Sequence, residues 1–579
     1  ETAEWAAGAV LRRTLYAHDA LGGRTVSAQD LDLDGRIGWT GSDRIASNDV
    51  RYVKADGDWW RESAAWESGA DASAELVFTG STRTRLTGLG ASGPHGTLAA
   101  ETVAVDRRGN ATVSRLWRNG AVSVRETAVP GSSVSKLAVS VRGLAVTNRT
   151  SAGVVASTEY DALGRPVAQF DGRGNRTSYA YDARGRIVSA TDAAGNVTKF
   201  GYDARGRRTS VTDPLGNAVT TAYDPEGRVL SVRGAACPVD WGYDEWGDRV
   251  SMATYRDGSL AAGDVTRWLR DAATGLVTNR VSADGRRTAY AYDALGRPVR
   301  RTDARGISTD YAYDAAGDLA QVSHSDGTPS AAFARDRAGR LVAAVTDGVS
   351  TNLLAYDAFG AVTNETQNGV AIERTYDGCG RLASMNGVAY GYDALGRLAS
   401  VEADGLSFMW LRVPGTDLLA GYVCGDFRRT VAYEPKRDLV AAVTNAFGDA
   451  VISSFGYGND AAVRRIAVTR GGSAFGDLAG SADSYGYNAR SEVVTALREK
   501  DGSEVYGFLE DFAYDPIGNR TESAVYDENG MRYVSAYESN ARNQYVSRTV
   551  PGLAAARGDA DARATVTVNG NPAFRLGGY

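Results

Sequence analysis

Short runs in which apolar and polar residues alternate, interrupted at regular intervals by glycine-containing turns, make up most of this chain. In one such run, Thr198, Phe200 and Tyr202 fall on one side, and smaller or polar residues fall on the other. Alternation with a period of two is typical of β-strands, whose successive side chains point to opposite faces of a sheet. The pattern therefore predicts an antiparallel meander of short strands with almost no helix.

Two turn motifs recur in a fixed phase along this meander. The motif Tyr-Asp-x-x-Gly-Arg repeats every 21 residues from Tyr160, and Asp-x-x-Gly-Asn lies between its copies, as at Asp171. Aspartate can accept hydrogen bonds from the backbone two residues on, and glycine takes a positive φ without steric cost, so both motifs predict tight turns. The structural residues predicted for the first four copies are Tyr160, Asp161, Gly164, Arg165, Tyr181, Asp182, Gly185, Arg186, Tyr202, Asp203, Gly206, Arg207, Tyr223, Asp224, Gly227 and Arg228.

The spacing of the strands limits how the repeated tyrosines can pack. Neighbouring strands are about 4.8 Å apart, so tyrosines on alternate strands are about 9.6 Å apart, too far for direct contact between rings. We therefore expect each tyrosine to pack against arginine and aliphatic side chains. Because strand twist accumulates, a ribbon of this length cannot stay flat and must coil or close.

The repeat of Tyr-Asp-x-x-Gly-Arg and Asp-x-x-Gly-Asn resembles the YD repeat of the rearrangement-hotspot (Rhs) family. The same repeat occurs in the C component of insecticidal toxin complexes and in teneurins. The resemblance is dense over residues 151–400 and looser to about residue 545. It implies an all-β fold in which an antiparallel YD-repeat β-ribbon is coiled into a hollow spiral shell. In bacterial members of the family, such a shell commonly encloses a C-terminal toxic polypeptide.

The regularity of the repeat predicts four parts along the chain. Residues 1–150 are an irregular, β-rich N-terminal part of the shell, residues 151–400 carry dense repeats, and residues 401–545 carry degenerate ones. Residues 546–579 are expected to be a linker, which includes the loop Pro551 to Arg563, and the start of a closing region missing from this sequence. We therefore expect the chain to be part of a longer protein.

Asp515-Pro-Ile-Gly518 resembles a motif of the closing segment at which some family members cleave themselves. The neighbouring Asn519 and Arg520 mark it as another repeat turn instead. We therefore assign no catalytic aspartate.

The charge balance and the scarcity of some residue types exclude several classes of protein. Lys and Arg number 64 and Asp and Glu 70, a formal net charge of −6, which gives no electrostatic footprint for nucleic acid. With 3 Cys, far apart in the sequence, and 3 His, neither a disulfide scaffold nor a zinc site is expected. No apolar run is long enough for a membrane helix, so no membrane span is expected in this sequence.

One acidic loop is a candidate cation site. Asp30, Asp32 and Asp34, followed by Gly35, match the first ligand positions of a calcium-binding loop, where alternate carboxylates can converge on one hard cation. The glutamate expected at the twelfth position is missing, and Asp43 is placed to substitute for it. The sequence thus makes this loop a candidate calcium site, and the favoured interpretation is a solvated acidic turn. No other cofactor is expected.

The recurrent Asp–Arg pairs predict a structural role. An active site needs one singular geometry, whereas these pairs recur in every repeat, so we interpret them as turn capping and expect no enzymatic activity. From the resemblance, we expect a secreted or cell-surface shell that encloses and protects a C-terminal toxin or other cargo of the same polypeptide, with a secretion apparatus as a partner for delivery. The competing hypothesis is a cell-surface adhesion or carbohydrate-binding scaffold, in which the repeated aromatic residues bind sugars instead of packing.

Overall fold

The computed structural model describes residues 1–6, 9–20, 22–70, 76–132, 135–150, 153–261, 263–505, 507–527, 529–550, 567–568 and 571–572. The loop predicted for Pro551 to Arg563 lies outside the described residues. The four parts predicted from repeat regularity stay a prediction.

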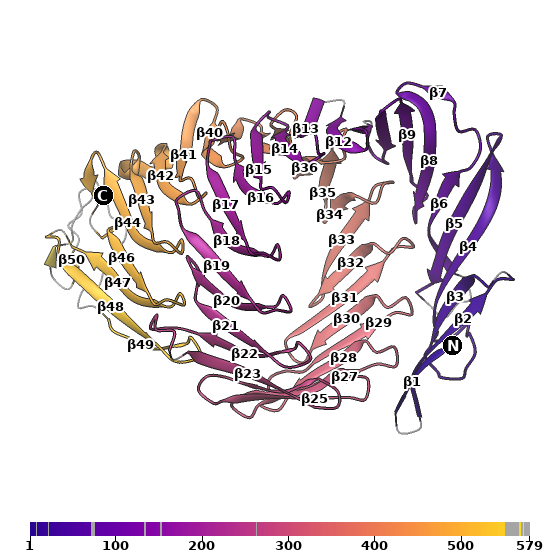
Figure 1. The fold of residues 1–579 in the computed structure, drawn as a ribbon, viewed down its shortest axis with the longest axis horizontal. Helices are drawn as coiled ribbons and strands as arrows, with labels where there is room; N and C mark the ends of the chain where they lie inside the picture. The colour runs from indigo at the N-terminus through magenta and orange to yellow at the C-terminus, as the bar shows by residue number, and fades with distance from the viewer. Residues whose placement is uncertain are drawn as a thin grey trace. The chain divides into compact units, whose positions relative to one another are not determined.

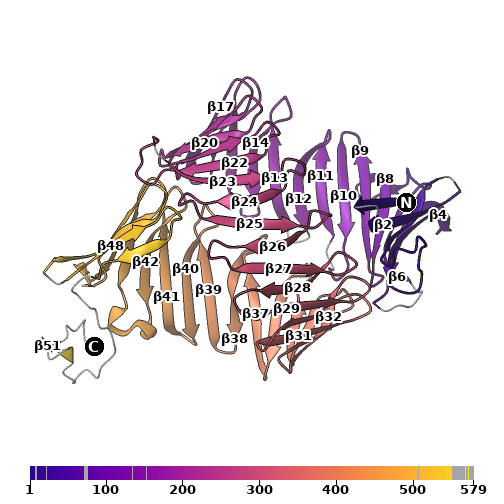
Figure 2. The same ribbon diagram turned by 90° about the horizontal axis from the view of Figure 1, so that it is seen from below.

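Nearly all the regular structure is β-strand, and the strands follow one another in chain order (Figures 1 and 2). The first strands are β1 Thr2–Ala6, β2 Ala9–His18, β3 Arg24–Asp30, β4 Arg44–Ala55, β5 Asp58–Ser68, β6 Leu76–Arg85, β7 Ser92–Gly93, β8 Gly96–Asp106, β9 Ala111–Asn119, β10 Val122–Ala128, β11 Lys136–Val141, β12 Leu144–Thr150 and β13 Gly153–Tyr160. The regular repeats then form β14 Pro166–Asp171, β15 Arg176–Tyr181, β16 Ile187–Thr191, β17 Val197–Tyr202, β18 Arg208–Thr212, β19 Ala218–Tyr223, β20 Val229–Gly234, β21 Val239–Tyr243, β22 Arg249–Thr254, β23 Asp264–Arg270, β24 Val277–Val281, β25 Arg287–Tyr292, β26 Pro298–Thr302, β27 Ser308–Tyr313, β28 Leu319–His324, β29 Ala331–Arg335, β30 Leu341–Thr346, β31 Ser350–Tyr356, β32 Val362–Gln367, β33 Val370–Tyr376, β34 Leu382–Met385, β35 Val388–Tyr392 and β36 Leu398–Ala403. The later strands are β37 Leu406–Arg412, β38 Leu419–Cys424, β39 Phe427–Tyr433, β40 Val440–Phe447, β41 Ala450–Asn459, β42 Arg465–Gly471, β43 Ala482–Tyr487, β44 Val493–Lys500, β45 Ser503–Glu504, β46 Glu510–Tyr514, β47 Arg520–Tyr526, β48 Arg532–Ser539, β49 Tyr545–Arg548, β50 Thr567–Val568 and β51 Asn571–Pro572.

The prediction of an all-β, antiparallel fold is confirmed. In the described part of the chain, β1 to β49 belong to one hydrogen-bonded sheet, and the helical structure there is a short 3-10 turn, η1, Ser473–Leu478. No helix among the described residues is long and apolar enough to cross a membrane.

The register of the repeat strands is interrupted at each repeat tyrosine. Ala180 lies opposite Ser189, but the next residue, Tyr181, lies opposite Ile187, so one extra residue forms a β-bulge. The same irregularity occurs at Tyr202 and Tyr223. A bulge increases the local twist, so the repeated bulges favour a twisted ribbon over a flat one.

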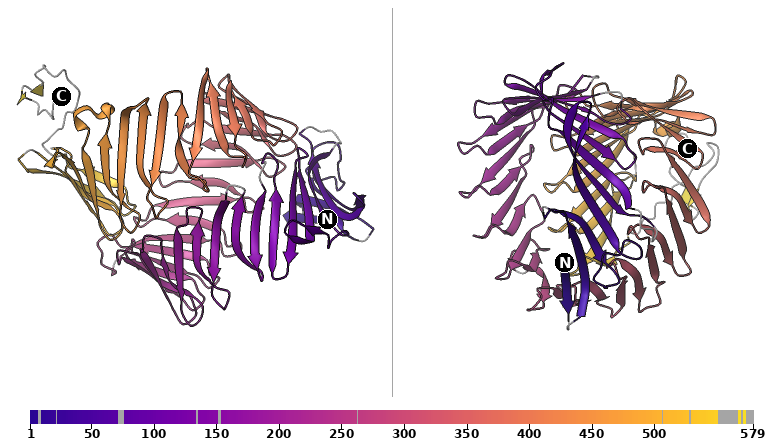
Figure 3. Two further views of the ribbon diagram at one scale, coloured as in Figure 1. Left: turned by 90° about the horizontal axis from the view of Figure 1, so that it is seen from above. Right: turned by 90° about the vertical axis from the view of Figure 1, so that its right-hand side faces the viewer.

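The chain divides into two compact units, each built from two long segments of the ribbon. Unit 1 comprises Glu1–Ser157, Arg270–Asn279 and Arg287–Ser407, and unit 2 comprises Thr158–Leu269, Arg280–Arg286 and Phe408–Tyr579. In Figure 3 the colour changes gradually from strand to strand within each of these segments, because neighbouring strands are neighbours in sequence. We call the two long segments of a unit its first and second segments.

Small apolar cores lie near the N-terminus, and the repeats have very few buried side chains. Val26, Ala28 and Ile45 form one buried cluster, and a second contains Leu98 and Trp117. Among the described residues of unit 2, the buried hydrophobic side chains are Ala168, Tyr255, Val443, Val505 and Ala524. Most described strand residues of the repeats are instead half-exposed.

Candidate functional site

The repeated Tyr-Asp-x-x-Gly-Arg motif forms a tight turn, here called the YD turn. In the copy at Asp182, the carboxylate oxygen Oδ1 accepts the backbone N–H groups of Arg184 and Arg186 at 2.9 and 3.0 Å. The Asp182 carbonyl accepts the N–H of Gly185, whose φ of 80° lies in the left-handed region that glycine adopts without strain. The motif therefore satisfies its own polar groups within five residues.

The arginine of each YD turn links that turn to the next one on the same edge of the ribbon. Arg186 Nε donates to Asp182 Oδ2 at 2.7 Å, and Arg186 Nη1 donates to the carbonyl of Asp203 at 3.0 Å. The Arg186 guanidinium also lies over the ring of Tyr202, 4.7 Å from its centroid. Tyr202 donates its hydroxyl hydrogen to the Ile187 carbonyl at 2.8 Å. Arginine–tyrosine packing, predicted from the strand spacing, is confirmed.

The same arrangement recurs along the chain. The other arginine–tyrosine pairs between successive YD turns are Arg165 with Tyr181, Arg207 with Tyr223, Arg228 with Tyr243, Arg297 with Tyr313, Arg340 with Tyr356, Arg381 with Tyr392 and Arg464 with Tyr487. The ring-to-guanidinium distances of these pairs lie between 4.3 and 4.9 Å.

These contacts shift the pKa values of the turn residues. Hydrogen bonds from the Arg186 backbone and side chain hold the pKa of Asp182 below its usual range. Hydrogen bonds from Arg165 lower the pKa of Asp161 in the same way. Burial raises the pKa of Tyr181, whose hydroxyl donates to the Pro166 carbonyl at 2.5 Å. Asp161 and Asp182 are therefore ionised and Tyr181 is protonated at neutral pH.

The Asp-x-x-Gly-Asn motif forms the turns on the opposite edge of the ribbon, here called DN turns. In the DN turn at Asp192, Oδ1 accepts the Asn196 N–H at 2.8 Å and Oδ2 accepts the Asn196 side-chain amide at 2.8 Å. The asparagine thus takes the place of the YD arginine without reaching the following turn.

In unit 2, DN turns of the first segment contact YD turns of the second. Arg173 donates to the carbonyls of Glu434, Pro435 and Arg437 at 2.6, 3.3 and 3.2 Å, and to Asp438 Oδ1 at 2.9 Å. These acceptors belong to one YD-type turn, more than 260 residues away in the sequence. A single arginine therefore holds two distant parts of the ribbon edge to edge.

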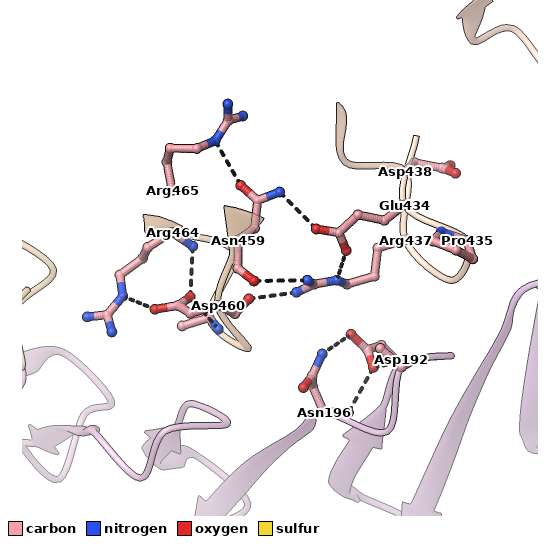
Figure 4. Close-up of polar contacts among 12 residues, drawn as sticks. Asp192, Asn196, Glu434, Pro435, Arg437, Asp438, Asn459, Asp460, Arg464 and Arg465 are labelled. Atoms are coloured by element: carbon pink, nitrogen blue, oxygen red, sulfur yellow. Dashed lines mark hydrogen bonds and ion pairs between the residues drawn. The ribbon is translucent and has the colours of Figure 1, made fainter. Parts of the chain in front are cut away.

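The turns of the second segment are connected to each other in the same region. Figure 4 shows Arg437 between Glu434 Oε2, at 2.5 Å from Nε, and the Asp460 carbonyl, at 2.6 Å from Nη1. Asn459 donates to Glu434 Oε1 at 2.8 Å, so the two neighbouring turns form one polar network.

Unit 1 has contacts of the same kind. Arg108 donates to Asp357 Oδ2 at 2.7 Å, and Asn110 donates to the Gly378 carbonyl at 2.8 Å. Arg337 of the second segment donates to the carbonyls of Asp43 and Trp39 at 2.9 and 3.0 Å. Edge-to-edge contact through arginine is thus a property of both units, and unit 1 adds an asparagine contact.

The predicted cation site lies in the loop that receives Arg337. Oxygen atoms of Asp30, Asp32 and Asp43 lie within 4.8 Å of one another, and the group includes Asp43 in place of the predicted Asp34. Asp34 Oδ1 instead accepts the N–H of Arg36 at 2.7 Å. Asp30 and Asp43 are buried, with 2% and 1% of their surface exposed, so this is not a fully solvated turn.

Protein groups already surround the two buried carboxylates. Asp43 accepts the backbone N–H groups of Leu31 and Gly38 at 2.9 and 2.8 Å, and Arg13 lies 3.3 Å from Asp30. A backbone hydrogen bond lowers the pKa of Asp32, but partial burial and its acidic neighbours outweigh this and raise it. These hydrogen bonds are enough to shape the loop around Arg337, and calcium binding stays a prediction.

The fold and its turns define a class: an all-β repeat protein whose antiparallel ribbon is stabilised by Tyr–Arg contacts between turns and by arginine contacts between distant segments. The RHS Repeat family model matches residues 160–197, 182–219, 202–236, 270–308 and 292–329. Residues 160–236 and 270–329 therefore carry Rhs repeats, also called YD repeats. No curated protein sequence matches it.

Solved structures of toxin-complex proteins share the fold. The crystal structure of TcdB2-TccC3-Cdc42 has a TM-score of 0.57 at 13% identity, and the match covers 87% of this chain and 27% of that one. The Photorhabdus luminescens Tc holotoxin pore has a TM-score of 0.56 at 14% identity, with the same coverage. TcdB2-TccC3 without its hypervariable C-terminal region also has a TM-score of 0.56 at 14% identity, covering 87% and 27%. The chain thus spans about a quarter of the length of these structures.

Sequence reasoning located the YD turns but missed the contacts between segments. Arg173 and Arg337 occupy ordinary turn positions, and nothing in the local repeat distinguishes them from exposed turn residues. Their partners are 261 to 299 residues away in sequence.

Proposed function

We propose that this chain is a non-catalytic wall segment that encloses and protects a C-terminal toxin polypeptide of the same protein during secretion and delivery. The chain is a scaffold of Rhs repeats, and the enclosed cargo is the part that the proposal adds. Three features of the molecule support it.

The observation that carries the proposal is the exposure of the sheet. The chain exposes 31,952 Å² of surface. Two compact units with a total mass of 61.2 kDa expose about 24,000 Å² together, so this chain exposes roughly 1.3 times as much. A sheet whose two faces both remain accessible is suited to separating two compartments, because one face can contact solvent and the other a guest.

The edge-to-edge contacts are the second support. A wall built from a ribbon has an opening wherever two adjacent edges separate, and exposed strand edges can pair with other chains. Arg173 and Arg108 hold neighbouring edges together within their units through charged hydrogen bonds to turn carbonyls and carboxylates.

The third support is the likeness in fold to the structures of TcdB2-TccC3-Cdc42 and of a Tc holotoxin pore. A further similar structure is TcdB2-TccC3 without its hypervariable C-terminal region. At 13 to 14% identity this likeness shows the fold alone, so an enclosed cargo is what we propose for this chain.

The test is a native purification of the protein as it is encoded, followed by a denaturing gel and intact mass. We expect a cleaved C-terminal polypeptide that co-purifies until the protein is denatured and that resists added protease until then. An intact chain whose C-terminal part is digested at the same rate as an unfolded control would refute enclosure and favour the surface-adhesion hypothesis.

A further inference from the structure

The face of the ribbon that carries the repeat tyrosines also carries other aromatic side chains, in unit 1 (Tyr290, Tyr311 and Tyr390) as well as in unit 2. In unit 2 they lie two residues before the repeat tyrosine, or before the Arg412 or Asn459 that replaces it. They are Tyr179, Phe200, Trp241, Trp410, Tyr457, Tyr485 and Phe512. All seven are half-exposed, so no other part of the chain covers them completely. We call this surface of unit 2 the tyrosine face.

Arginine side chains lie over four of these seven rings, each in the same arrangement. The guanidinium of Arg208 lies 5.8 Å from the ring of Phe200, and that of Arg249 lies 5.4 Å from Trp241. Each arginine is the first strand residue after a YD turn and lies opposite the repeat tyrosine, which fixes it on this face.

The second segment of unit 2 repeats the arrangement. The guanidinium of Arg465 lies 3.9 Å from Tyr457, and that of Arg520 lies 4.7 Å from Phe512. The corresponding positions in the regular repeats of unit 1 are all apolar. They are Pro298, Leu319, Leu341, Val362, Leu382 and Leu398. Among the regular repeats these arginines therefore occur in unit 2, where other copies have an apolar residue such as Ile187 or Val229 at the same position, so the repeat itself does not require them. Unit 1 has one such pair before its regular repeats, Arg24 at 4.9 Å from the ring of Tyr16.

These four arginines differ from the turn arginines in having no carboxylate partner in the described part of the chain. Each turn arginine such as Arg186 is paired with its own turn aspartate. Arg465 donates instead to the neutral Asn459 side chain at 3.0 Å, and the Arg520 guanidinium lies 6.0 Å from the centre of the Tyr537 ring. In a chain of net charge −6, four guanidinium groups without a carboxylate partner among the described residues are distributed along the tyrosine face.

We propose that the tyrosine face of unit 2 binds acidic, aromatic-containing segments of a non-native polypeptide. A guanidinium stacked on a ring still presents its edge N–H groups, which can bind a carboxylate in a bidentate manner. Half-exposed aromatic rings between the arginines supply apolar contact for side chains that a folded protein would bury. The inference rests on the proposed function, for which it names the surface that contacts the enclosed polypeptide.

The same geometry disfavours the other ligands that aromatic surfaces bind. A sugar ring stacks on an open aromatic face, but here a guanidinium already covers one face of the ring. Nucleic acid presents regularly spaced phosphates, whereas Arg208 in β18 and Arg249 in β22 are four strands, or about 19 Å, apart. Widely spaced guanidinium groups are better suited to the irregularly spaced carboxylates of an acidic polypeptide.

The test compares two triple variants of the full chain with the same change in charge. One replaces Arg208→Gln, Arg249→Gln and Arg465→Gln on the tyrosine face. The matched control replaces three exposed arginines that the strand register places on the opposite face of the same unit: Arg176→Gln, Arg267→Gln and Arg428→Gln. Circular dichroism and light scattering verify that both variants keep the β-fold and the particle mass of the parent.

The probe is a synthetic disordered 30-residue peptide containing Glu and Tyr, measured by fluorescence anisotropy beside the same peptide with Lys for Glu. We expect the tyrosine-face variant to bind the acidic peptide about tenfold more weakly, and the control variant to bind within about twofold of the parent. Equal losses in both variants, or no preference for the acidic peptide, would overturn the inference. Tighter binding of single-stranded DNA or of maltohexaose, lost in the same variant, would reassign the surface to that ligand and also overturn it.

This experiment separates the inference from the proposed function. If the encoded protein retains a protected cargo but its affinity for the acidic peptide does not depend on the three arginines, the enclosure stands and the binding surface is refuted. If the affinity for the peptide depends on these arginines while no cargo is retained, the binding surface stands and the enclosure is refuted.

Discussion

Removing one hydroxyl group from a YD turn tests whether the turn-to-turn contacts hold the ribbon together. Tyr202→Phe deletes the 2.8 Å hydrogen bond to the Ile187 carbonyl and keeps the ring beneath Arg186. A hydrogen bond of this kind contributes about 1 kcal/mol net to stability, and its loss leaves a partly buried carbonyl without that donor. Because each repeat contacts mainly its neighbours, the loss is expected to act locally.

Hydrogen exchange measured by mass spectrometry is the suitable assay, since a chain of 579 residues is not expected to unfold in one step. A local loss of about 1 kcal/mol makes exchange about fivefold faster for amides in β16 and β17, while β30 to β33 are unchanged. The matched control is Tyr179→Phe, because the Tyr179 hydroxyl donates to the exposed side chain of Gln169, which water can replace. Equal acceleration in both variants, or none in Tyr202→Phe, would refute the idea that the turn tyrosine stabilises the ribbon through its hydroxyl.

Three further predictions concern the contacts between segments, acid stability and calcium. Arg173→Ala removes the hydrogen-bond donors to the carbonyls of Glu434, Pro435 and Arg437, so amide hydrogen exchange in residues 433–440 should accelerate several-fold. The control Arg176→Ala should leave this exchange unchanged. No difference between the two variants would contradict a role of Arg173 in joining the segments. The pKa values of Asp161 and Asp182 are lowered in the fold, so their contribution to stability is fully present above the ordinary aspartate pKa and is lost as the pH falls below about 4; circular dichroism should be constant from about pH 7 to 5, and a cooperative loss near pH 6 would count against it. If the predicted calcium site exists, isothermal titration calorimetry of the full chain gives heat on addition of calcium. Asp43→Asn should abolish this heat and Asp34→Asn should reduce it less, because Asp43 and not Asp34 belongs to the cluster. Absence of heat at about millimolar calcium would contradict calcium binding and leave the carboxylates as structural groups.

The YD turn could be predicted from the sequence because everything that it needs lies within a few residues. Asp182 bonds the backbone of Arg184 and Arg186, and Gly185 supplies the left-handed conformation. The pairing of Arg186 with Tyr202 also follows, since both lie at fixed positions of consecutive repeats.

The cation site shows how far local reasoning reaches. The spacing of Asp30, Asp32 and Asp34 follows a known loop pattern, for which the sequence also offers Asp43 as a substitute ligand, and the structure groups Asp43, not Asp34, with the first two. Asp43 reaches them because its carboxylate accepts the N–H of Leu31 twelve residues earlier, a closure that depends on the path of the whole loop.

The sequence by itself therefore determined the strands, both kinds of turn and the contacts between neighbouring turns, since these depend on separations of about one repeat. The tertiary structure alone decided that Arg173 meets Glu434 and that Arg337 meets Asp43, at separations of 261 and 294 residues. Such partners depend on the twist accumulated over many strands and bulges, and a small change in twist per strand would bring different turns together. The local repeat pattern does not specify this accumulated twist, so it does not predict which distant turns meet.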